Sequence, residues 1–278
     1  MWLELKNPHS VLAALEERPG EVGTIRLGGK PPTGVWREVT ALAERVGVRV
    51  EARRSTEARG GRRKRVPEPS RTPAAMALVR PRAPLELERL FEPSAGADRP
   101  PATTGEEPRR QSHKQHTRPA TVAHRPRSRR LWLGLDGLQD PQNVGAIFRT
   151  AAFFGVDGIV VTEHRSAPLS STVYDVASGG MEYVPFAIVP KLRAAIRKAK
   201  QLGAWVLGTS EHAPAPIQTV DRERDWFVLL GGEQSGLRRL TREECDELRA
   251  IPPAGTGVTS LNVSVAAGIV IATLRLWP

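Results

Sequence analysis

The sequence has very little cysteine, few aromatic residues and no long apolar run. A single cysteine, Cys245, excludes a disulfide framework and a zinc site built from cysteines alone. The best candidate for a membrane span covers only residues 263–274 and contains Ser264 and Thr273, so we expect no membrane-spanning segment. The start of the chain lacks the basic and apolar stretches of a secretory signal, and we therefore expect a soluble protein of the reducing cytoplasm.

Positive charge is concentrated in the first half of this chain of 278 residues. Residues 1–130 contain 27 of the 41 Lys and Arg residues and 15 of the 30 acidic ones, whereas residues 131–278 contain 14 and 15. A basic region beside a nearly neutral one indicates a part that binds a polyanion, joined to a part with another task. Nucleic acid is the polyanion we expect, because Lys and Arg neutralise its phosphates. The alternative is a solvated, arginine-rich surface.

The first zone, residues 1–85, predicts a small α/β domain. Its apolar spacing favours a helix over residues 35–46 and short strands over residues 24–27 and 48–50, and residues 74–79 form a candidate closing strand.

The second zone, residues 86–130, predicts a flexible basic linker. From residue 94 onward it is rich in Pro, Arg, Ser, Thr and His and has almost no large apolar residue, so it cannot bury enough surface to offset its ordering entropy. Such a tether either holds RNA loosely or acts as a passive spacer.

The third zone, residues 131–278, alternates strand and helix patterns. This alternation predicts an α/β domain with a mostly parallel sheet and helices on both faces. The expected strands cover residues 131–135, 158–161, 184–189, 204–207 and 226–230. The expected helices cover residues 143–154, 171–178, 191–202, 241–248 and 261–276, and the fourth begins with a capping box of Thr241 and Glu244.

Familiar phosphate and metal signatures are absent. The glycine-rich segment 231–236 lacks the Gly-Lys-Ser/Thr ending of a P-loop, and no dinucleotide-binding glycine pattern follows a strand. Three histidines fall in the linker without cysteine partners, so we expect no metal site. Cys245 has no nearby histidine and is interpreted as a small helix residue rather than a nucleophile.

Three polar clusters remain, in residues 136–149, 231–236 and 251–262, each at a predicted strand end or helix start. Open α/β sheets bind ligands at such positions. In the first cluster, Asn143 is interpreted either as a helix cap or as a functional residue, and Arg149 lies inside an otherwise apolar helix, where a buried cation needs a partner or a phosphate.

The second cluster is either a glycine turn that lets a ligand approach the backbone closely or a tight turn with an incidental acid, Glu233. In the third cluster, Ser260 and Asn262 both stand at a helix entrance. Capping explains one of them but hardly both.

In this order and spacing, the three clusters resemble the three motifs of the SpoU (TrmH-type) RNA ribose 2′-O-methyltransferases of the SPOUT superfamily. The likeness runs from Leu133 to Leu274, and segments 165–167, 177–180 and 240–248 are most similar to the bacterial branch that modifies a guanosine of 23S rRNA. That branch usually has a His-Gln-Gly segment where this chain has residues 65–73, and a methionine at the position of Pro253. These departures concern the RNA target.

The resemblance implies a deep trefoil knot in the C-terminal domain, an exception to the rule against knots, and S-adenosylmethionine bound in it. It also implies a homodimer through the C-terminal domain, an RNA substrate and not DNA, and an N-terminal domain that binds the RNA. The cofactor-binding residues it implies are Thr209, Gly231, Gly232, Ile251 and Leu261.

The resemblance gives Arg149 the decisive catalytic role, in its own subunit or across the dimer. Because a guanidinium stays protonated, we interpret Arg149 as a clamp on a neighbouring phosphate and a stabiliser of the developing alkoxide. Asn143, Ser260 and Asn262 would orient the ribose and the methionine moiety, and Glu233 would organise Arg149 or accept a proton. The alternatives are a tRNA or antibiotic-resistance methylase of the same family and a non-catalytic RNA-binding or ribosome-assembly protein.

Overall fold

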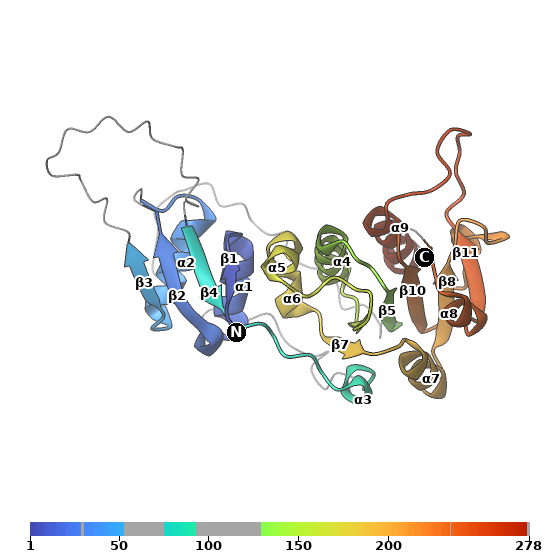
Figure 1. Ribbon diagram of the computed structural model, residues 1–278, viewed down its shortest axis with the longest axis horizontal. Coiled ribbons are helices and arrows are strands. Elements are labelled where there is room, and N and C mark those ends of the chain that lie inside the picture. Colours follow the sequence, from blue (N-terminus) through green and yellow to red (C-terminus); the bar gives the residue numbers. More distant parts are fainter. Residues whose placement is uncertain (29–30, 53–74, 93–128, 234, 277–278) are drawn as a thin grey trace, which may run out of the picture.

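The computed structural model describes residues 1–28, 31–52, 75–92, 129–233 and 235–276, which form two α/β parts side by side (Figure 1). Most of the predicted linker, with its three histidines, lies outside the described residues. None of the described helices is long and apolar enough to cross a membrane.

The N-terminal part is a four-stranded sheet in the order β1-β4-β2-β3, with two helices packed against it. Strand β4 runs antiparallel to β1 and β2, and β3 runs parallel to β2. The three predicted strands and the predicted helix α2 are confirmed, whereas β1 is too short to show a pattern. The elements are β1 (Leu3–Leu5), α1 (Pro8–Glu17), the 3-10 helix η1 (Pro19–Glu21), β2 (Val22–Leu27), α2 (Val35–Arg45), β3 (Arg49–Ala52) and β4 (Ala75–Val79).

The C-terminal part contains a seven-stranded sheet in the order β7-β6-β5-β10-β8-β11-β9. Every pairing between neighbours in this sheet is parallel, which confirms the predicted fold class of a mostly parallel α/β sheet. The strands are β5 (Leu131–Asp136), β6 (Gly158–Thr162), β7 (Phe186–Val189), β8 (Trp205–Thr209), β9 (Ala215–Pro216), β10 (Trp226–Gly231) and β11 (Glu247–Ala250).

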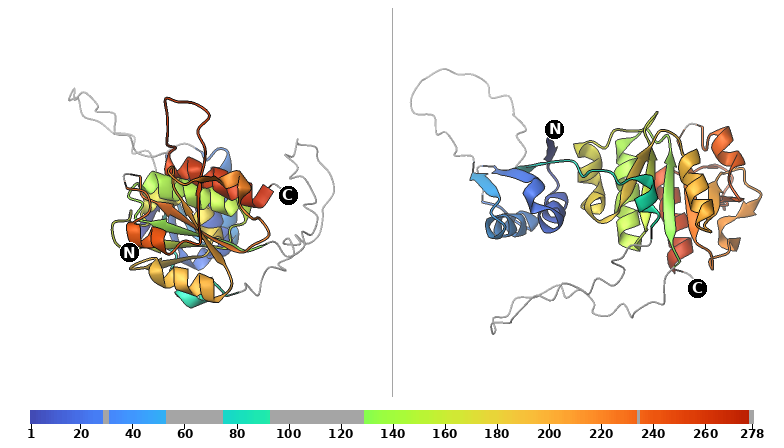
Figure 2. Two further views of the ribbon diagram at one scale, coloured as in Figure 1. Left: turned by 90° about the vertical axis from the view of Figure 1, so that its right-hand side faces the viewer. Right: turned by 90° about the horizontal axis from the view of Figure 1, so that it is seen from below.

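Helices cover both faces of this sheet, as the end-on view in Figure 2 shows. Successive strand residues alternate between the faces, so Leu133 and Val228 belong to one core cluster and Trp132 and Phe227 to the other. The first cluster lies under α4, α5 and α9, and the second under α3 and α7. The helices are α3 (Leu87–Leu90), α4 (Pro141–Phe154), α5 (Ser171–Ala177), α6 (Gly180–Tyr183), α7 (Arg193–Gln201), the 3-10 helix η2 (Ile217–Thr219), α8 (Arg239–Glu243) and α9 (Val263–Leu276).

One predicted helix is wrong. The pattern over residues 241–248 predicts a helix, but α8 ends at Glu243 and Glu247 begins strand β11, which pairs with β8. Asp246 joins the two strands, since its backbone N–H donates to Val206 O and its carboxylate accepts from Val206 N at 2.9 Å. A free edge of β8 therefore outweighs the local capping pattern.

The start of the predicted linker belongs to the core. Leu90 and Phe91 are buried, and the Phe91 ring lies 5.0 Å from that of Trp132 and 5.6 Å from that of Phe227, measured between centroids. The proline- and arginine-rich composition of the zone as a whole hides these few apolar residues at its beginning.

A polar network joins the two parts of the chain. The Asp175 carboxylate accepts from the backbone N–H groups of Lys6 and Asn7, both at 2.9 Å, and Asn7 Nδ2 donates to Ser178 Oγ at 2.9 Å. The Arg82 guanidinium donates to the carbonyl oxygens at positions 181 and 184. With the apolar core shared across the boundary, these bonds hold the N-terminal part in one position against α5 and α6.

The interface also contains a bidentate ion pair between Arg18 and Glu182. The two N–O distances are 2.6 and 2.7 Å, and the Glu182 side chain is only 1% exposed. Burial alone would lower the pKa of Arg18, but the hydrogen bond and the charge of Glu182 raise it.

Replacing Arg18 with Met is therefore expected to lower the free energy of unfolding by about 3–5 kcal/mol, because it strands a buried carboxylate. Urea unfolding followed by circular dichroism measures this loss. The matched control is Arg80→Met, which breaks an exposed pair with Glu21 and should cost at most about 1 kcal/mol. Equal losses in both variants would contradict the account.

Candidate active site

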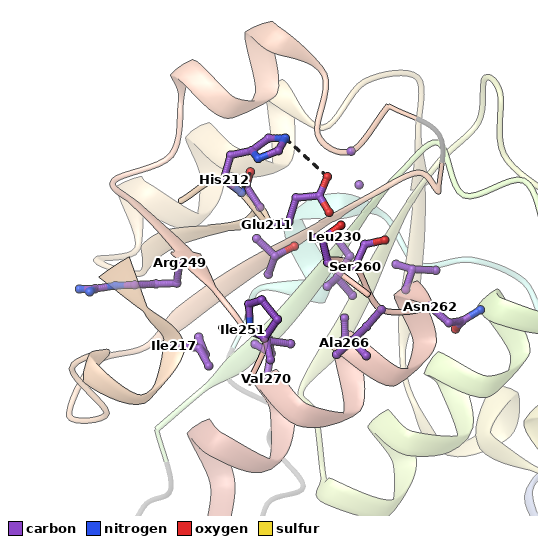
Figure 3. A pocket seen from close by; sticks show the side chains of 18 of the residues that line it. Glu211, His212, Ile217, Leu230, Arg249, Ile251, Ser260, Asn262, Ala266 and Val270 are labelled. Atoms are coloured by element: carbon purple, nitrogen blue, oxygen red, sulfur yellow. Dashed lines mark hydrogen bonds and ion pairs between the residues drawn. The ribbon is translucent and has the colours of Figure 1, made fainter. Parts of the chain in front are cut away.

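A cavity of about 1130 Å³ opens where β8, β10 and β11 end, and the start of α9 closes one side of it (Figure 3). Ile217, Leu230 and Val270 are buried and form its apolar floor. Eight of the ten predicted site residues line this cavity: Thr209, Gly231, Gly232, Glu233, Ile251, Ser260, Leu261 and Asn262. An apolar floor with polar groups around it suits a flat, polar-edged ligand.

The glycine cluster lets backbone form the wall of the cavity. A Cβ atom on Gly231 would lie 2.0 Å from the Gly236 carbonyl carbon, and one on Gly232 would lie 2.8 Å from Gly137 O. The Gly236 N–H donates to Gly232 O at 2.9 Å and closes the turn. No side chain fits between these segments, which favours the ligand-approach interpretation of the cluster.

The side chains expected to bind the cofactor differ in their hydrogen bonding and in their exposure. The Thr209 hydroxyl donates to Leu229 O at 3.0 Å and so bridges β8 and β10. Ile251 is half-buried at the end of β11, whereas Leu261 is 48% exposed on the rim. The Thr209 side chain therefore supports the strands, and Leu261 is free to cover a ligand.

Asn262 and Ser260 have different roles at the helix entrance. Asn262 caps α9, since its Oδ1 accepts from Ser264 N at 2.9 Å and from Ser264 Oγ at 2.6 Å. Ser260 has no hydrogen-bond partner among the described residues and is exposed at the rim. Figure 3 shows the Asn262 side chain directed toward α4. Capping therefore explains Asn262 but not Ser260.

Asn143 meets Glu233 although ninety residues separate them. The buried Asn143 Nδ2 donates to Glu233 Oε1 at 2.8 Å, which joins the first cluster to the second. The interpretation of Asn143 as a helix cap is wrong, because Asp140 caps α4 with a bond from Gln142 N to its Oδ1 at 2.9 Å. A buried amide aimed at a rim carboxylate fits a functional role.

Arg149 is exposed, which corrects the expectation of a buried cation. The helical period points Ile147 and Phe148 into the core, but it points Arg149 and Phe153, one turn on, outward. Six residues after Asn143, Arg149 projects about 240° further round the helix. Arg149 is not among the residues that line the cavity and has no partner among the described residues.

Sequence reasoning missed several lining residues. Ser210, Glu211 and His212 follow β8, and the exposed His212 Nε2 lies 3.5 Å from Glu211 Oε1. Their position at the end of a predicted strand could have marked them as site residues. Arg249 points away from the cavity in Figure 3 and pairs with Glu247. Ile217 and Val270 carry no signal that separates them from ordinary core residues.

Cys245 lies beyond the end of α8, so its interpretation as a helix residue is wrong, and its thiol is not suited to act as a nucleophile. Burial raises its pKa to about 12, and its Sγ lies 3.4 Å from Thr241 O. Because the thiolate is the reactive form, we expect iodoacetamide at pH 8 to label folded Cys245 far more slowly than the urea-unfolded chain. Mass spectrometry of timed samples measures both rates, and equal rates would show that the thiol is accessible and ionised.

The sequence of residues 130–272 matches the SpoU rRNA Methylase family. The chain belongs to this family. The match covers both the cavity and α4, so the SpoU-family region includes all ten predicted site residues.

Relatives of the SpoU-family region carry a specific name. The chain is 48% identical over 139 residues to the 23S rRNA (guanosine-2′-O-)-methyltransferase RlmB of Nitrosomonas europaea, which covers 50% of this chain and 53% of the relative. The chain is 44% identical over 139 residues to the RlmB of Pseudomonas aeruginosa, and this match covers 50% of this chain and 56% of the relative. The chain thus spans about half the length of the curated relatives it matches.

Solved structures share the fold along nearly the whole chain. The SpoU methyltransferase AviRb from Streptomyces viridochromogenes, in complex with the cofactor AdoMet, has a TM-score of 0.67 at 21% identity and covers 99% of this chain and 89% of its own. An AdoMet-bound rRNA methyltransferase from Sinorhizobium meliloti has a TM-score of 0.65 at 20% identity, with 99% and 87% covered. At these identities the likeness shows the fold.

Proposed function

We propose that this SpoU-family protein transfers a methyl group from S-adenosylmethionine to the ribose 2′-hydroxyl of a guanosine in 23S rRNA. The observation that carries the proposal is the cavity, which brings eight predicted site residues together inside the region that matches the family. The names of the relatives supply the substrate, because both are 23S rRNA guanosine methyltransferases.

The cavity fits the cofactor that we propose. Gly231 and Gly232 leave backbone exposed to the edge of an adenine, and Leu230, Ile251 and Val270 supply an apolar slot for its faces. Ser260 and Leu261, exposed on the rim, are placed to contact the ribose and methionine groups. Bound there, S-adenosylmethionine supplies a methyl group activated by a positively charged sulfur.

The reaction forms a bond between the ribose 2′-oxygen and the methyl carbon, breaks the carbon–sulfur bond, and releases the hydroxyl proton. A hydroxyl is a weak nucleophile at neutral pH, so a nearby base helps this proton to leave. Asn143 holds Glu233 by Oε1, and Glu233 has no other partner among the described residues. Glu233 is therefore our proposed proton acceptor or organiser of Arg149. Asn143, Ser260 and the Nδ2 group of Asn262, which has no partner among the described residues, would orient the substrates.

The chain works as a homodimer in this proposal, and Arg149 acts across the interface. Phe153 is 82% exposed and Val265 50%, and Ile269 and Leu276 continue this apolar stripe along α9. Arg149 lies one helical turn from Phe153, on the same outward side of α4. A second copy that covers the stripe would bury its apolar surface and receive Arg149 near its own cavity, where the guanidinium would bind a phosphate and stabilise the developing alkoxide.

The proposal includes a knotted path of the chain in the C-terminal part. The strand order places β10 between the earlier strands β5 and β8, and α9 returns to pack against α4, which is compatible with the knotted path that the family resemblance implies.

The N-terminal part, residues 1–85, and the basic linker would bind RNA, because the excess positive charge lies there. Ribosomal RNA would be the substrate, with neither DNA nor a membrane as partner, and the proposed location is the cytoplasm.

Incubation of the purified full chain with 23S rRNA and methyl-labelled S-adenosylmethionine tests this function. We expect label at one guanosine, found by primer extension at low deoxynucleotide concentration, and no label on DNA of the same sequence, which lacks the 2′-hydroxyl. Label on tRNA alone would move the substrate to another branch of the family. Tight RNA binding with no label on any RNA, and no heat on titration with S-adenosylmethionine, would indicate an RNA-binding protein without catalysis.

A further inference from the structure

The loop that follows β6 holds a strained, exposed arginine. Among the described residues only Arg165 and Ser178 are non-glycine residues with a left-handed backbone, at φ 59° and φ 48°. Such a conformation costs about 1–2 kcal/mol for a side chain with a Cβ atom. The surrounding structure must therefore enforce it at both positions.

The strain at Ser178 has a structural explanation, whereas that at Arg165 has none. Ser178 ends α5, and its hydroxyl accepts from Asn7 Nδ2 at 2.9 Å, so its conformation serves the junction between the two parts. The Arg165 side chain is exposed and has no partner among the described residues. Among the described residues, no hydrogen bond or ion pair of the Arg165 side chain accounts for this conformation.

Hydrogen bonds hold the residues before and after Arg165 in place. The carbonyl of His164 accepts from the Arg238 guanidinium at 3.2 Å, and the Ala167 N–H donates to Leu138 O at 2.7 Å. Next to these bonds, the Ser166 hydroxyl lies 2.7 Å from Thr162 Oγ1. The fold therefore fixes the direction in which Arg165 leaves the loop while the guanidinium stays free to bind.

This loop borders the rim of the cavity. A Cβ atom on Gly137, after β5, would lie 3.4 Å from Arg165 O. One on Gly232, after β10, would lie 2.8 Å from Gly137 O. The loop of Arg165 therefore packs near the loop of Gly137, which packs against the loop that contains Glu233. The strand order β6-β5-β10 explains this contact, because parallel strands end at one edge. Arg165 thus stands two strands from the proposed reaction centre.

The charges around Arg165 favour an anionic ligand. Arg238 is occupied by the buried Asp136, with Nε 3.4 Å from Oδ1, so it acts as support. Lys191, which is exposed just after β7 and has no partner among the described residues, adds a second cation at the same edge, where Val189 O accepts from Glu163 N. Glu163 is the exposed acid of this loop and is compensated by the two cations.

We propose that Arg165 binds a backbone phosphate of the RNA strand beside the nucleotide whose ribose enters the active site. A guanidinium on a rigid loop binds a phosphate with two parallel hydrogen bonds and fixes the register of the strand. The inference rests on the proposed function, since it places the same RNA substrate on the edge that leads to Glu233.

The test compares Arg165→Asn with the wild type. Asparagine tolerates the left-handed conformation, so we expect an unchanged melting temperature and unchanged affinity for S-adenosylmethionine. Filter binding to 23S rRNA fragments should weaken roughly tenfold through loss of a charged hydrogen bond. The slope of log affinity against log salt should fall by about one, since one phosphate contact is lost.

The matched control is Arg197→Gln, which removes an exposed cation from the middle of α7 that has no partner in the described part of the chain. It should leave RNA affinity within about twofold, as for a surface charge that makes no contact. Equal affinities for Arg165→Asn and Arg197→Gln would overturn the inference. Binding is measured without turnover, so a wild type that binds RNA but transfers no methyl group contradicts only the proposed function.

Discussion

Replacing Arg149 with alanine is expected to reduce methyl transfer by a factor of about 10²–10³ while affinity for S-adenosylmethionine is unchanged. The guanidinium lies outside the cavity of its own chain, so its removal leaves the cofactor walls intact. It would stabilise the oxyanion in the transition state, and the loss of such stabilisation reduces kcat rather than affinity for S-adenosylmethionine. Single-turnover transfer to 23S rRNA and calorimetry measure the two quantities, and Arg197→Ala serves as the charge-matched control.

Mixed dimers decide whether Arg149 acts across the interface. If it does, a random mixture of Arg149→Ala and Gly231→Ala chains should regain roughly one quarter of wild-type activity at an S-adenosylmethionine concentration too low to load the Gly231→Ala cavity, because half of the dimers combine one intact cavity with one intact Arg149. If Arg149 serves its own chain, the mixture stays inactive. Unchanged turnover by Arg149→Ala itself would remove this residue from the mechanism.

Gly231→Ala is expected to weaken binding of S-adenosylmethionine by at least about tenfold, or about 1.4 kcal/mol. Its methyl group would lie 2.0 Å from the Gly236 carbonyl carbon, so the turn that forms the cavity wall must move. Isothermal titration calorimetry measures the affinity, and circular dichroism checks that the sheet is retained.

Gly255→Ala is the matched control for this substitution. Gly255 also lines the cavity, has no left-handed backbone, and has open space around the position of its Cβ. We expect wild-type affinity from Gly255→Ala. If Gly231→Ala also binds the cofactor normally, the glycine turn does not form the cofactor wall.

Local patterns predicted the fold well where an element is long and its pattern is strong. The buried run of β10 and the period of α4 both lie within a few residues of their predicted bounds. The pattern over residues 241–248 failed because pairing with β8 is a long-range interaction that no local window contains. The same limit hides Leu90 and Phe91 inside a linker-like composition.

The candidate site also has features that local sequence predicted and features that only the fold creates. The resemblance to the family motifs predicted that the glycine turn and the loop before α9 belong to the site, and both line the cavity. They could be predicted because each is a short continuous segment of sequence. The bond between Asn143 and Glu233 could not be predicted from spacing, because the sheet order creates it. Arg149 looked buried because its sequence neighbours are apolar, yet they face the core while Arg149 faces outward. An apolar outward face indicates an interaction surface, and in our proposal a second copy covers it.

The most direct test of the central claim is a map of 2′-O-methyl groups in the RNA of a strain that lacks this gene. The account predicts that one guanosine of 23S rRNA loses its methyl group, that every tRNA site is kept, and that the wild-type gene restores the modification but Arg149→Ala does not. A 23S rRNA map that is identical with and without the gene would contradict it.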